Sequence, residues 1–275
     1  MRNGLDISPA GPWGEPGQQA EFAALAERSG WDGVFCEDYL AFRDGLRAYD
    51  PWITLGLMAG ATTRITLGTM VTPLPWRQPS SVAAQAMTID QISGGRFVLG
   101  VGSGDTGGPD ARFVESMSLK QRVERLDEGL EVIAALWSGE PVTHHGRHFH
   151  LDEALLLPRP VQRPRIPIWV GGQLTRPGPR ARALRWDGAC LYAAPPEDDW
   201  VDLTVEDVRR LRADGGPGFV IAVGGRRRRA DLAAERDYAA ALAEAGVDWL
   251  HEYVPPDVSP AQARERIESG PISAD

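Results

Sequence analysis

The chain has 275 residues, of which 43% are hydrophobic and 24% charged, and its formal net charge at pH 7 is −9. This composition is typical of a globular protein, and the acidic excess argues against nucleic acid or an anionic membrane as the main partner. No apolar run approaches the roughly 20 residues that a bilayer-crossing helix needs, and the first residues lack the charged and apolar regions of a signal peptide.

Short apolar runs recur along the whole chain and are rich in Val, Ile, Phe and Leu, as strands buried on both faces should be. Eight candidate strands are predicted, at Gly4–Ile7, Gly33–Cys36, Ile65–Val71, Phe97–Val101, Ile166–Val170, Gly188–Tyr192, Phe219–Val223 and Trp249–Tyr253. Cys36 and Cys190 lie within these runs and are expected to be buried thiols, which favours a reducing, cytoplasmic location.

Amphipathic helices are predicted between the strands. One extends from Pro79 to a stop at Gly94, and another keeps an apolar face for about five turns up to Trp137. Ser118 and Gln121 form a capping-box pattern at the start of the second helix. Strands and helices therefore alternate through most of the sequence.

A helix stop, an Asp and a strand follow one another three times, around Asp32, Asp187 and Asp248. In each copy the Asp is placed to bond backbone in a tight turn between a helix and the next strand. Repetition of one such turn, with eight strands, favours a single (β/α)8 barrel domain over residues 1–275. A doubly wound parallel sheet is the competing architecture.

Residues 138–165 interrupt this alternation with six prolines or glycines and a short alternating piece, and they predict an inserted hairpin and extended excursion within the barrel. The excursion holds four histidines, His144, His145, His148 and His150. A zinc site is conceivable at these spacings, but no Cys accompanies the histidines, so a solvated hairpin is favoured. Alternation would place His148 and His150 on one face.

Gly102, Gly104 and Gly107 satisfy the G-x-G-x-x-G pattern of dinucleotide-binding proteins. That pattern should open a helix at once, whereas the next firm helix begins near Ser118. The better interpretation is a strand end, Gly102, Ser103 and Gly104, at the carboxyl face of a barrel, where small residues let a flat ligand lie against backbone.

Two further segments are candidates for anion binding. Gly171, Gly172 and Gln173 end a strand, where backbone N–H groups could face a phosphate. The basic block that begins at Arg226 follows the seventh strand, where barrels often bind phosphate. A solvated charge run remains the alternative for the basic block.

Polar residues also follow the second and fourth strands. Asp38 and Tyr39 come after the second, and Asp105 after the fourth. All three would project at the catalytic face of a barrel, although each could also be an ordinary cap or turn residue.

Several segments, in order and spacing, resemble the bacterial luciferase-like superfamily of flavin- and F420-dependent oxidoreductases. They are the segments 60–69, 90–97, 99–104, 124–128, 158–160, 168–172 and 186–188, with Pro79 at a helix start. The resemblance covers roughly residues 1–195 and is fainter beyond.

The resemblance implies a TIM barrel, often dimeric, that binds an isoalloxazine ring at the carboxyl ends of its strands. Deazaflavin-type members carry an Asp-His pair where this chain has Asp38-Tyr39, and tend to carry Glu where it has Asp105. Tyr39 is a poor acid or base near neutrality and more plausibly donates a hydrogen bond. Many members also have a non-proline cis peptide that corresponds to Met70–Val71.

The leading hypothesis is thus a flavin- or F420-dependent oxidoreductase that performs hydride transfer or monooxygenation on a small organic substrate. F420 is slightly favoured over FMN because the Ala- and Arg-rich composition is typical of high-GC bacteria. In this hypothesis the ring lies against Met70, Val71 and the 102–104 strand end, with Asp38 and Asp105 near its polar edge. Trp13, Trp76 and Tyr39 would line an apolar substrate side. The alternatives are a flavin-binding barrel without turnover and an NAD-dependent Rossmann enzyme, and a homodimer is expected from family habit.

Overall fold

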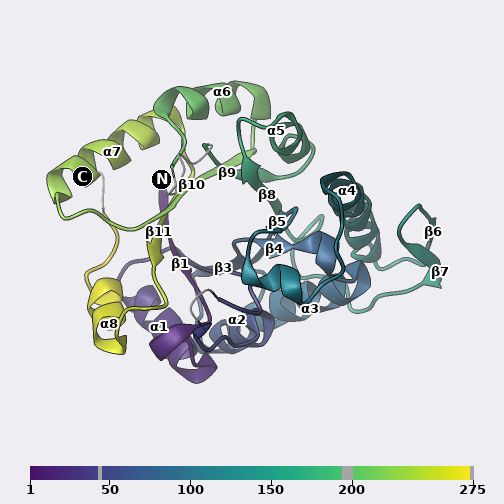
Figure 1. The fold of residues 1–275 in the computed structure, drawn as a ribbon, viewed down its shortest axis with the longest axis horizontal. Helices are drawn as coiled ribbons and strands as arrows, with labels where there is room; N and C mark the ends of the chain where they lie inside the picture. Colours follow the sequence, from purple (N-terminus) through teal and green to yellow (C-terminus); the bar gives the residue numbers. More distant parts are fainter. Residues whose placement is uncertain (43–44, 194–200, 273–275) are drawn as a thin grey trace.

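A computed structural model describes residues 1–42, 45–193 and 201–272. Eight parallel strands form one closed barrel, in the order β3-β2-β1-β11-β10-β9-β8-β5, and the pairing of β3 with β5 completes the ring (Figure 1). Their bounds are β1 Arg2–Ile7, β2 Gly33–Cys36, β3 Thr66–Thr69, β5 Phe97–Gly102, β8 Ile168–Gln173, β9 Gly188–Tyr192, β10 Val220–Arg226 and β11 Trp249–Val254. The predicted TIM barrel is confirmed, and closure of the sheet excludes the doubly wound alternative.

Eight α-helices connect the strands within the described residues: α1 Pro16–Arg28, α2 Pro51–Ala61, α3 Pro79–Ser93, α4 Leu119–Leu136, α5 Pro177–Ala183, α6 Val205–Gly215, α7 Leu232–Ala245 and α8 Pro260–Glu268. The predicted caps are present. Ser118 and Gln121 form a reciprocal capping box on α4, and Gly94 ends α3 in the left-handed conformation that glycine adopts without steric cost. No helix in the described ranges is long and apolar enough to span a membrane.

Shorter elements connect these units. A two-residue strand, β4 (Thr72–Pro73), pairs with the end of β5. The 3₁₀ turns that lie wholly within the described residues are η1 Gly11–Trp13, η3 Leu74–Trp76 and η4 Pro109–Arg112. After β5 the chain thus runs through a loop and η4 before α4 begins at Leu119. A glycine pattern that does not open a helix lacks the geometry of a dinucleotide fingerprint.

The three repeated Asp turns work as the sequence predicts. Asp32 accepts a hydrogen bond from the N–H of Asn3, Asp187 from Ile168 and Asp248 from Ile221, at 2.8, 2.7 and 2.8 Å. Each carboxylate thereby fastens the start of one strand to a residue on the neighbouring strand.

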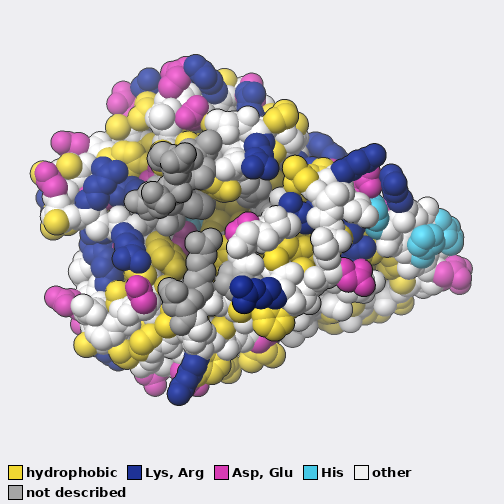
Figure 2. All heavy atoms as spheres, viewed as in Figure 1, with side chains coloured by type: hydrophobic (Ala, Val, Ile, Leu, Met, Phe, Trp, Pro, Cys, Tyr) yellow, Lys and Arg dark blue, Asp and Glu magenta, His cyan; other side chains and the backbone are white. Residues whose placement is uncertain are grey.

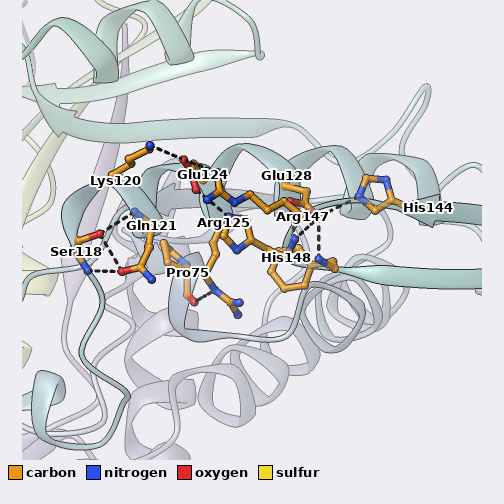
Figure 3. Close-up of polar contacts among 11 residues, drawn as sticks. Pro75, Ser118, Lys120, Gln121, Glu124, Arg125, Glu128, His144, Arg147 and His148 are labelled. Carbon is orange, nitrogen blue, oxygen red and sulfur yellow. Dashed lines mark hydrogen bonds and ion pairs between the residues drawn. The ribbon is translucent and has the colours of Figure 1, made fainter.

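The excursion forms an antiparallel hairpin of β6 (Val142–His145) and β7 (His150–Ala154) that projects beyond α4 (Figure 1). His144 lies 3.2 Å from Glu128 and His148 lies 3.1 Å from Glu124, so two histidines bind glutamates of α4 (Figure 3). The hairpin is therefore docked rather than fully solvated. His148 precedes β7 and the exposed His150 pairs with His145, so the prediction that His148 and His150 share a face is wrong.

The amino-terminal half of the barrel interior is filled by aromatic rings. Phe35, Trp169 and Trp249 form a buried cluster with ring centroids 5.4 to 5.8 Å apart. Glycines face the rings, because a Cβ on Gly33 or Gly188 would lie only 2.8 Å from a ring atom. This aromatic plug closes the barrel from below and sets the depth of the cleft above it.

Candidate active site

A cleft of about 750 Å³ opens at the carboxyl ends of the strands, the face on which TIM barrels carry their active sites. Every one of the eight barrel strands, or the residues directly after it, contributes to the lining. Figure 2 shows the face of the molecule that is hollowed near its centre, with hydrophobic side chains in the hollow.

One wall of the cleft is flat because it is built on glycines. The methyl groups of Val71 lie over Gly102 and Gly171, and a Cβ on these two residues would come within 2.9 and 3.1 Å of them. Val71 follows a non-proline cis peptide with Met70, as predicted from the resemblance. Met70, Val71, Gly102 and Gly171 all line the cleft. Such a wall fits the face of a planar ring.

The floor of the cleft holds an acid–histidine pair. His251 Nδ1 lies 2.6 Å from Asp6 Oδ1, and both side chains are buried. The ring of His251 contacts Phe35, with centroids 4.5 Å apart, and its Nε2 has no hydrogen-bond partner among the described residues. Nδ1 is therefore the nitrogen that carries the proton toward Asp6.

Glu37 lies beside this pair and was not singled out by the sequence. Its carboxylate accepts hydrogen bonds from Ser8 and, at 3.3 Å, from Tyr253. Burial, together with the charge of Asp6, raises the pKa of Glu37 to about 7, although the hydrogen bonds from Ser8 and Tyr253 act against this shift. Strand alternation could have found it: Phe35 points into the barrel, so Glu37 does too, whereas Asp38 does not.

Asp38 is placed outside the cleft. Its buried carboxylate accepts a hydrogen bond from Trp52 Nε1 at 2.9 Å and forms an ion pair with Arg77. Burial raises the pKa of Asp38, and the charge of Arg77 acts against that shift. The neighbouring Tyr39 does line the cleft. Burial raises the pKa of Tyr39 well above its usual range, and the charge of Glu37 adds to this shift.

The segment after β5 forms the rim. Gly102, Ser103, Gly104 and Asp105 all line the cleft, and the exposed Asp105 accepts a hydrogen bond from the N–H of Gly107. The buried Arg122 of α4 donates to the carbonyl oxygens of Ser103 and Gly104 and so fixes the loop. Asp105 therefore lies at the cleft, as predicted, and is also a turn residue, which was the alternative interpretation.

Aromatic residues predicted on the substrate side separate into two groups. Trp76 and Tyr39 line the cleft, and a Cβ on Gly104 would touch the ring of Trp76. Trp13 is fully buried against Phe22 and donates to the carbonyl of Pro255, so its predicted place beside a substrate is wrong.

The candidate anion-binding residues also separate. Gly171 and Gly172 line the cleft, whereas Gln173 does not and accepts a hydrogen bond from Arg176. Gly172 has a φ of +145°, and a Cβ there would lie 2.9 Å from Pro179. The close approach of Pro179 excludes a side chain at this position.

The basic block alternates between internal and exposed residues. Arg226 borders the cleft, but its guanidinium binds Glu235 and Asp202 at 2.9 and 2.8 Å. Arg227 and Arg229 also border the cleft, and their side chains are 66% and 67% exposed. Among the described residues their contacts with carboxylates are 3.8 Å long. The cations of the block that are open to a ligand are therefore Arg227 and Arg229 rather than Arg226.

The comparisons with known proteins agree with this architecture. The luciferase-like monooxygenase family matches residues 1–269, so the chain belongs to the luciferase-like family. It is 34% identical over 174 residues to an F420-dependent glucose-6-phosphate dehydrogenase of Microbacterium testaceum, a match that covers 62% of this chain and 49% of the relative. It is 32% identical over 165 residues to an F420-dependent hydroxymycolic acid dehydrogenase of Mycobacterium tuberculosis, covering 59% and 44%.

The chain thus spans about half the length of the curated relatives it matches. Solved structures match over more of the chain. An F420-dependent secondary alcohol dehydrogenase in complex with an F420-acetone adduct superimposes with a TM-score of 0.77, covering 100% of this chain and 99% of the other at 19% identity. The monooxygenase RslO1 of Streptomyces bottropensis gives 0.73, with 97% and 96% covered at 20% identity. At these identities the likeness concerns the fold.

Proposed function

We propose that this protein is an oxidoreductase that binds a deazaflavin or flavin in the cleft and transfers hydride to or from, or oxygenates, a small organic substrate. The observation that carries the proposal is the glycine-based wall under Val71, since a flat surface at the carboxyl ends of barrel strands suits a planar ring. The names of the relatives support the same class of chemistry.

The ring would lie against Met70, Val71 and Gly102, with Ser103 and Asp105 at its polar edge. Gly171 and Gly172 offer backbone free of side chains for a phosphate group. Arg227 and Arg229 take the anion-binding role first assigned to Arg226, because the Arg226 guanidinium is already paired. Bound cofactor supplies the electrons, and the protein positions the ring and the substrate and excludes water.

F420 is the favoured cofactor and FMN the second. The curated relatives described above are F420-dependent, and the two exposed arginines at the mouth would suit the acidic tail of a deazaflavin. Gln173, outside the cleft lining, would act through Arg176, and Asp38 would hold Trp52 and Arg77 behind the wall. We further propose a cytoplasmic homodimer in which residues 1–275 act as one barrel domain.

The test is an anaerobic titration of the protein with F420, FMN, reduced FMN and NADH, followed by quenching of its tryptophan fluorescence. Tight binding of F420 with weak binding of FMN is expected and would direct the substrate search to alcohols, ketones and enones. Preference for reduced FMN would indicate oxygen chemistry. Binding of NADH alone would contradict the proposal, and cofactor binding without turnover of any substrate would leave a flavin-binding barrel.

A further inference from the structure

We propose that Glu37 is a catalytic residue that exchanges a proton with a hydroxyl or carbonyl oxygen of the substrate, with Ser8 and Tyr253 as its positioning residues. The inference rests on the oxidoreductase function proposed above. It gives the cleft an acid–base group at a place where neither the glycine pattern nor the family resemblance put one.

The register of three adjacent strands brings these side chains together. β1 lies between β2 and β11, with Ile7 beside Cys36 and Asp6 beside Tyr253. Ser8 and Glu37 are the next residues along β1 and β2 and so meet at one level of the barrel. The hydroxyl of Ser8 bonds Glu37 and lies 3.1 Å from that of Tyr253, which also bonds Glu37. The carboxylate is held from both sides and lines the cleft.

Five other ionisable side chains at or near the cleft are less well placed than Glu37 to exchange a proton with a substrate. Burial raises the pKa of Tyr39 and of Cys190 above the working range, and Asp38 is enclosed with Arg77. Asp105 is exposed at the rim, where it caps a turn. His251 uses Nδ1 for Asp6, and its Nε2 is buried beside Gly4.

Asp6, which is hydrogen-bonded to His251 on the cleft floor, raises the pKa of Glu37. The hydrogen bond from His251 to Asp6 holds a second carboxylate beside Glu37, and the charge on Asp6 disfavours ionisation of Glu37. When two neighbouring carboxyl groups have different partners, their pKa values differ, so that one can hold a proton while the other stays charged. The other groups that face this cluster are Tyr39, Tyr253 and Arg227, whose charge favours ionisation of Tyr253.

The proposed step balances in both directions. When an alcohol is oxidised, its hydroxyl proton passes to the Glu37 carboxylate, and hydride leaves its carbon for an oxidised deazaflavin. The O–H and C–H bonds break and the C=O bond forms. When a carbonyl compound is reduced by a reduced deazaflavin, protonated Glu37 returns the proton to the oxygen.

The geometry predicts shifts of opposite sign in the pKa of Glu37. Asp6→Asn removes a repelling charge and should lower this pKa, whereas Ser8→Ala and Tyr253→Phe remove hydrogen bonds to the charged form and should raise it. These shifts test whether Glu37 is the group that titrates near pH 7, and its role in proton exchange is tested separately by kinetics.

The experiment follows the carboxyl groups of the full-length protein, labelled with ¹³C at Glu Cδ, through a pH titration by NMR without cofactor. One resonance that titrates near pH 7, is absent in Glu37→Gln and persists in the exposed control Glu140→Gln is expected. Absence of such a resonance, or shifts of the wrong sign in Asp6→Asn and Tyr253→Phe, would overturn the proposal.

Kinetics on the F420-loaded protein complete the test. Glu37→Gln should lower kcat by about 100-fold or more, leave F420 affinity within about twofold and remove the limb of the pH profile near 7, and Glu37→Asp should restore part of the rate. Unchanged kcat in Glu37→Gln with intact F420 binding would refute the role of Glu37 alone. Failure of the wild-type protein to bind F420 or FMN would refute the proposed function instead.

Discussion

Both halves of the barrel interior place glycines opposite larger side chains, but the two arrangements have different consequences. In the amino-terminal half, Gly33 and Gly188 make room for rings that fill the space, and the result is a solid plug. In the carboxyl-terminal half, Gly102 and Gly171 lie under Val71, and no ring fills the space beyond, so the result is an open flat wall. The same residue type therefore stabilises the fold in one region and leaves room for a ligand in the other.

The two halves of the barrel interior also differ in their content of ionisable side chains. The described residues of the plug are aromatic or apolar up to His251, whereas Asp6, Glu37, Tyr39 and Tyr253 surround the cleft floor. Burial of ionisable groups is unfavourable unless other interactions compensate, so their concentration in one region indicates a functional rather than a stabilising role.

The largest effect is expected from filling the wall. Gly102→Val should weaken F420 binding by about 100-fold or more, which corresponds to about 2.7 kcal/mol, because the added side chain would collide with Val71, against which the ring would lie. The apparent Kd from fluorescence quenching measures this. Gly107→Val is the matched control, since Gly107 lies outside the cleft lining and a Cβ there is 3.4 Å from Asp105. Equal losses in both variants would favour a dinucleotide loop over a barrel wall.

A substitution in the plug is expected to lower stability without changing F420 affinity. Gly188→Ala should lower the free energy of unfolding by about 1–3 kcal/mol, since the added Cβ would lie 2.8 Å from both Trp169 and the carbonyl oxygen of Val220. Thermal denaturation would reveal the loss, with F420 affinity of the folded protein retained. Gly60→Ala, where a Cβ meets nothing within 4 Å, should leave stability equal or slightly higher. A large loss of F420 affinity in Gly188→Ala would break the separation of the two regions.

A smaller effect is expected outside the barrel interior, at Glu27. Burial alone would raise its pKa, but N–H groups of Ile65, Arg64 and Thr63 bond the carboxylate and bring the pKa down to about 2. Because the folded-state pKa is lowered, this stabilisation is present above about pH 4.5 and is lost as the pH falls through 2. Glu27→Gln should cost about 1–2 kcal/mol at pH 7 and much less at pH 2, as urea denaturation would measure. Equal losses at both pH values would contradict this.

The smallest effect is expected at the hairpin. His148→Ala removes a contact with Glu124 that is partly exposed to solvent and should cost less than about 1 kcal/mol. F420 affinity should not change, because the hairpin lies outside the cleft lining. A change in affinity, measured by the same fluorescence titration, would show that the hairpin communicates with the cleft.

The barrel could be read from the sequence because its signals are local. Gly33–Cys36 and Gly188–Tyr192 were predicted with their observed bounds, and the Asp turns at Asp32, Asp187 and Asp248 repeat within short segments. The site was harder to predict, since its lining residues come from all eight strands and are far apart in the sequence. The resemblance pointed to Met70 and Val71, but the choice between Glu37 and Asp38 depends on which side of β2 faces the interior.

The most direct test of the account is hydrogen–deuterium exchange of the protein with and without saturating F420. We predict slower exchange in peptides that cover residues 70–73, 102–106 and 171–174, with the hairpin at 142–154 unchanged. Protection confined to the hairpin, or no protection near Val71 and Gly171 despite bound F420, would contradict the assignment of the glycine wall as the cofactor site.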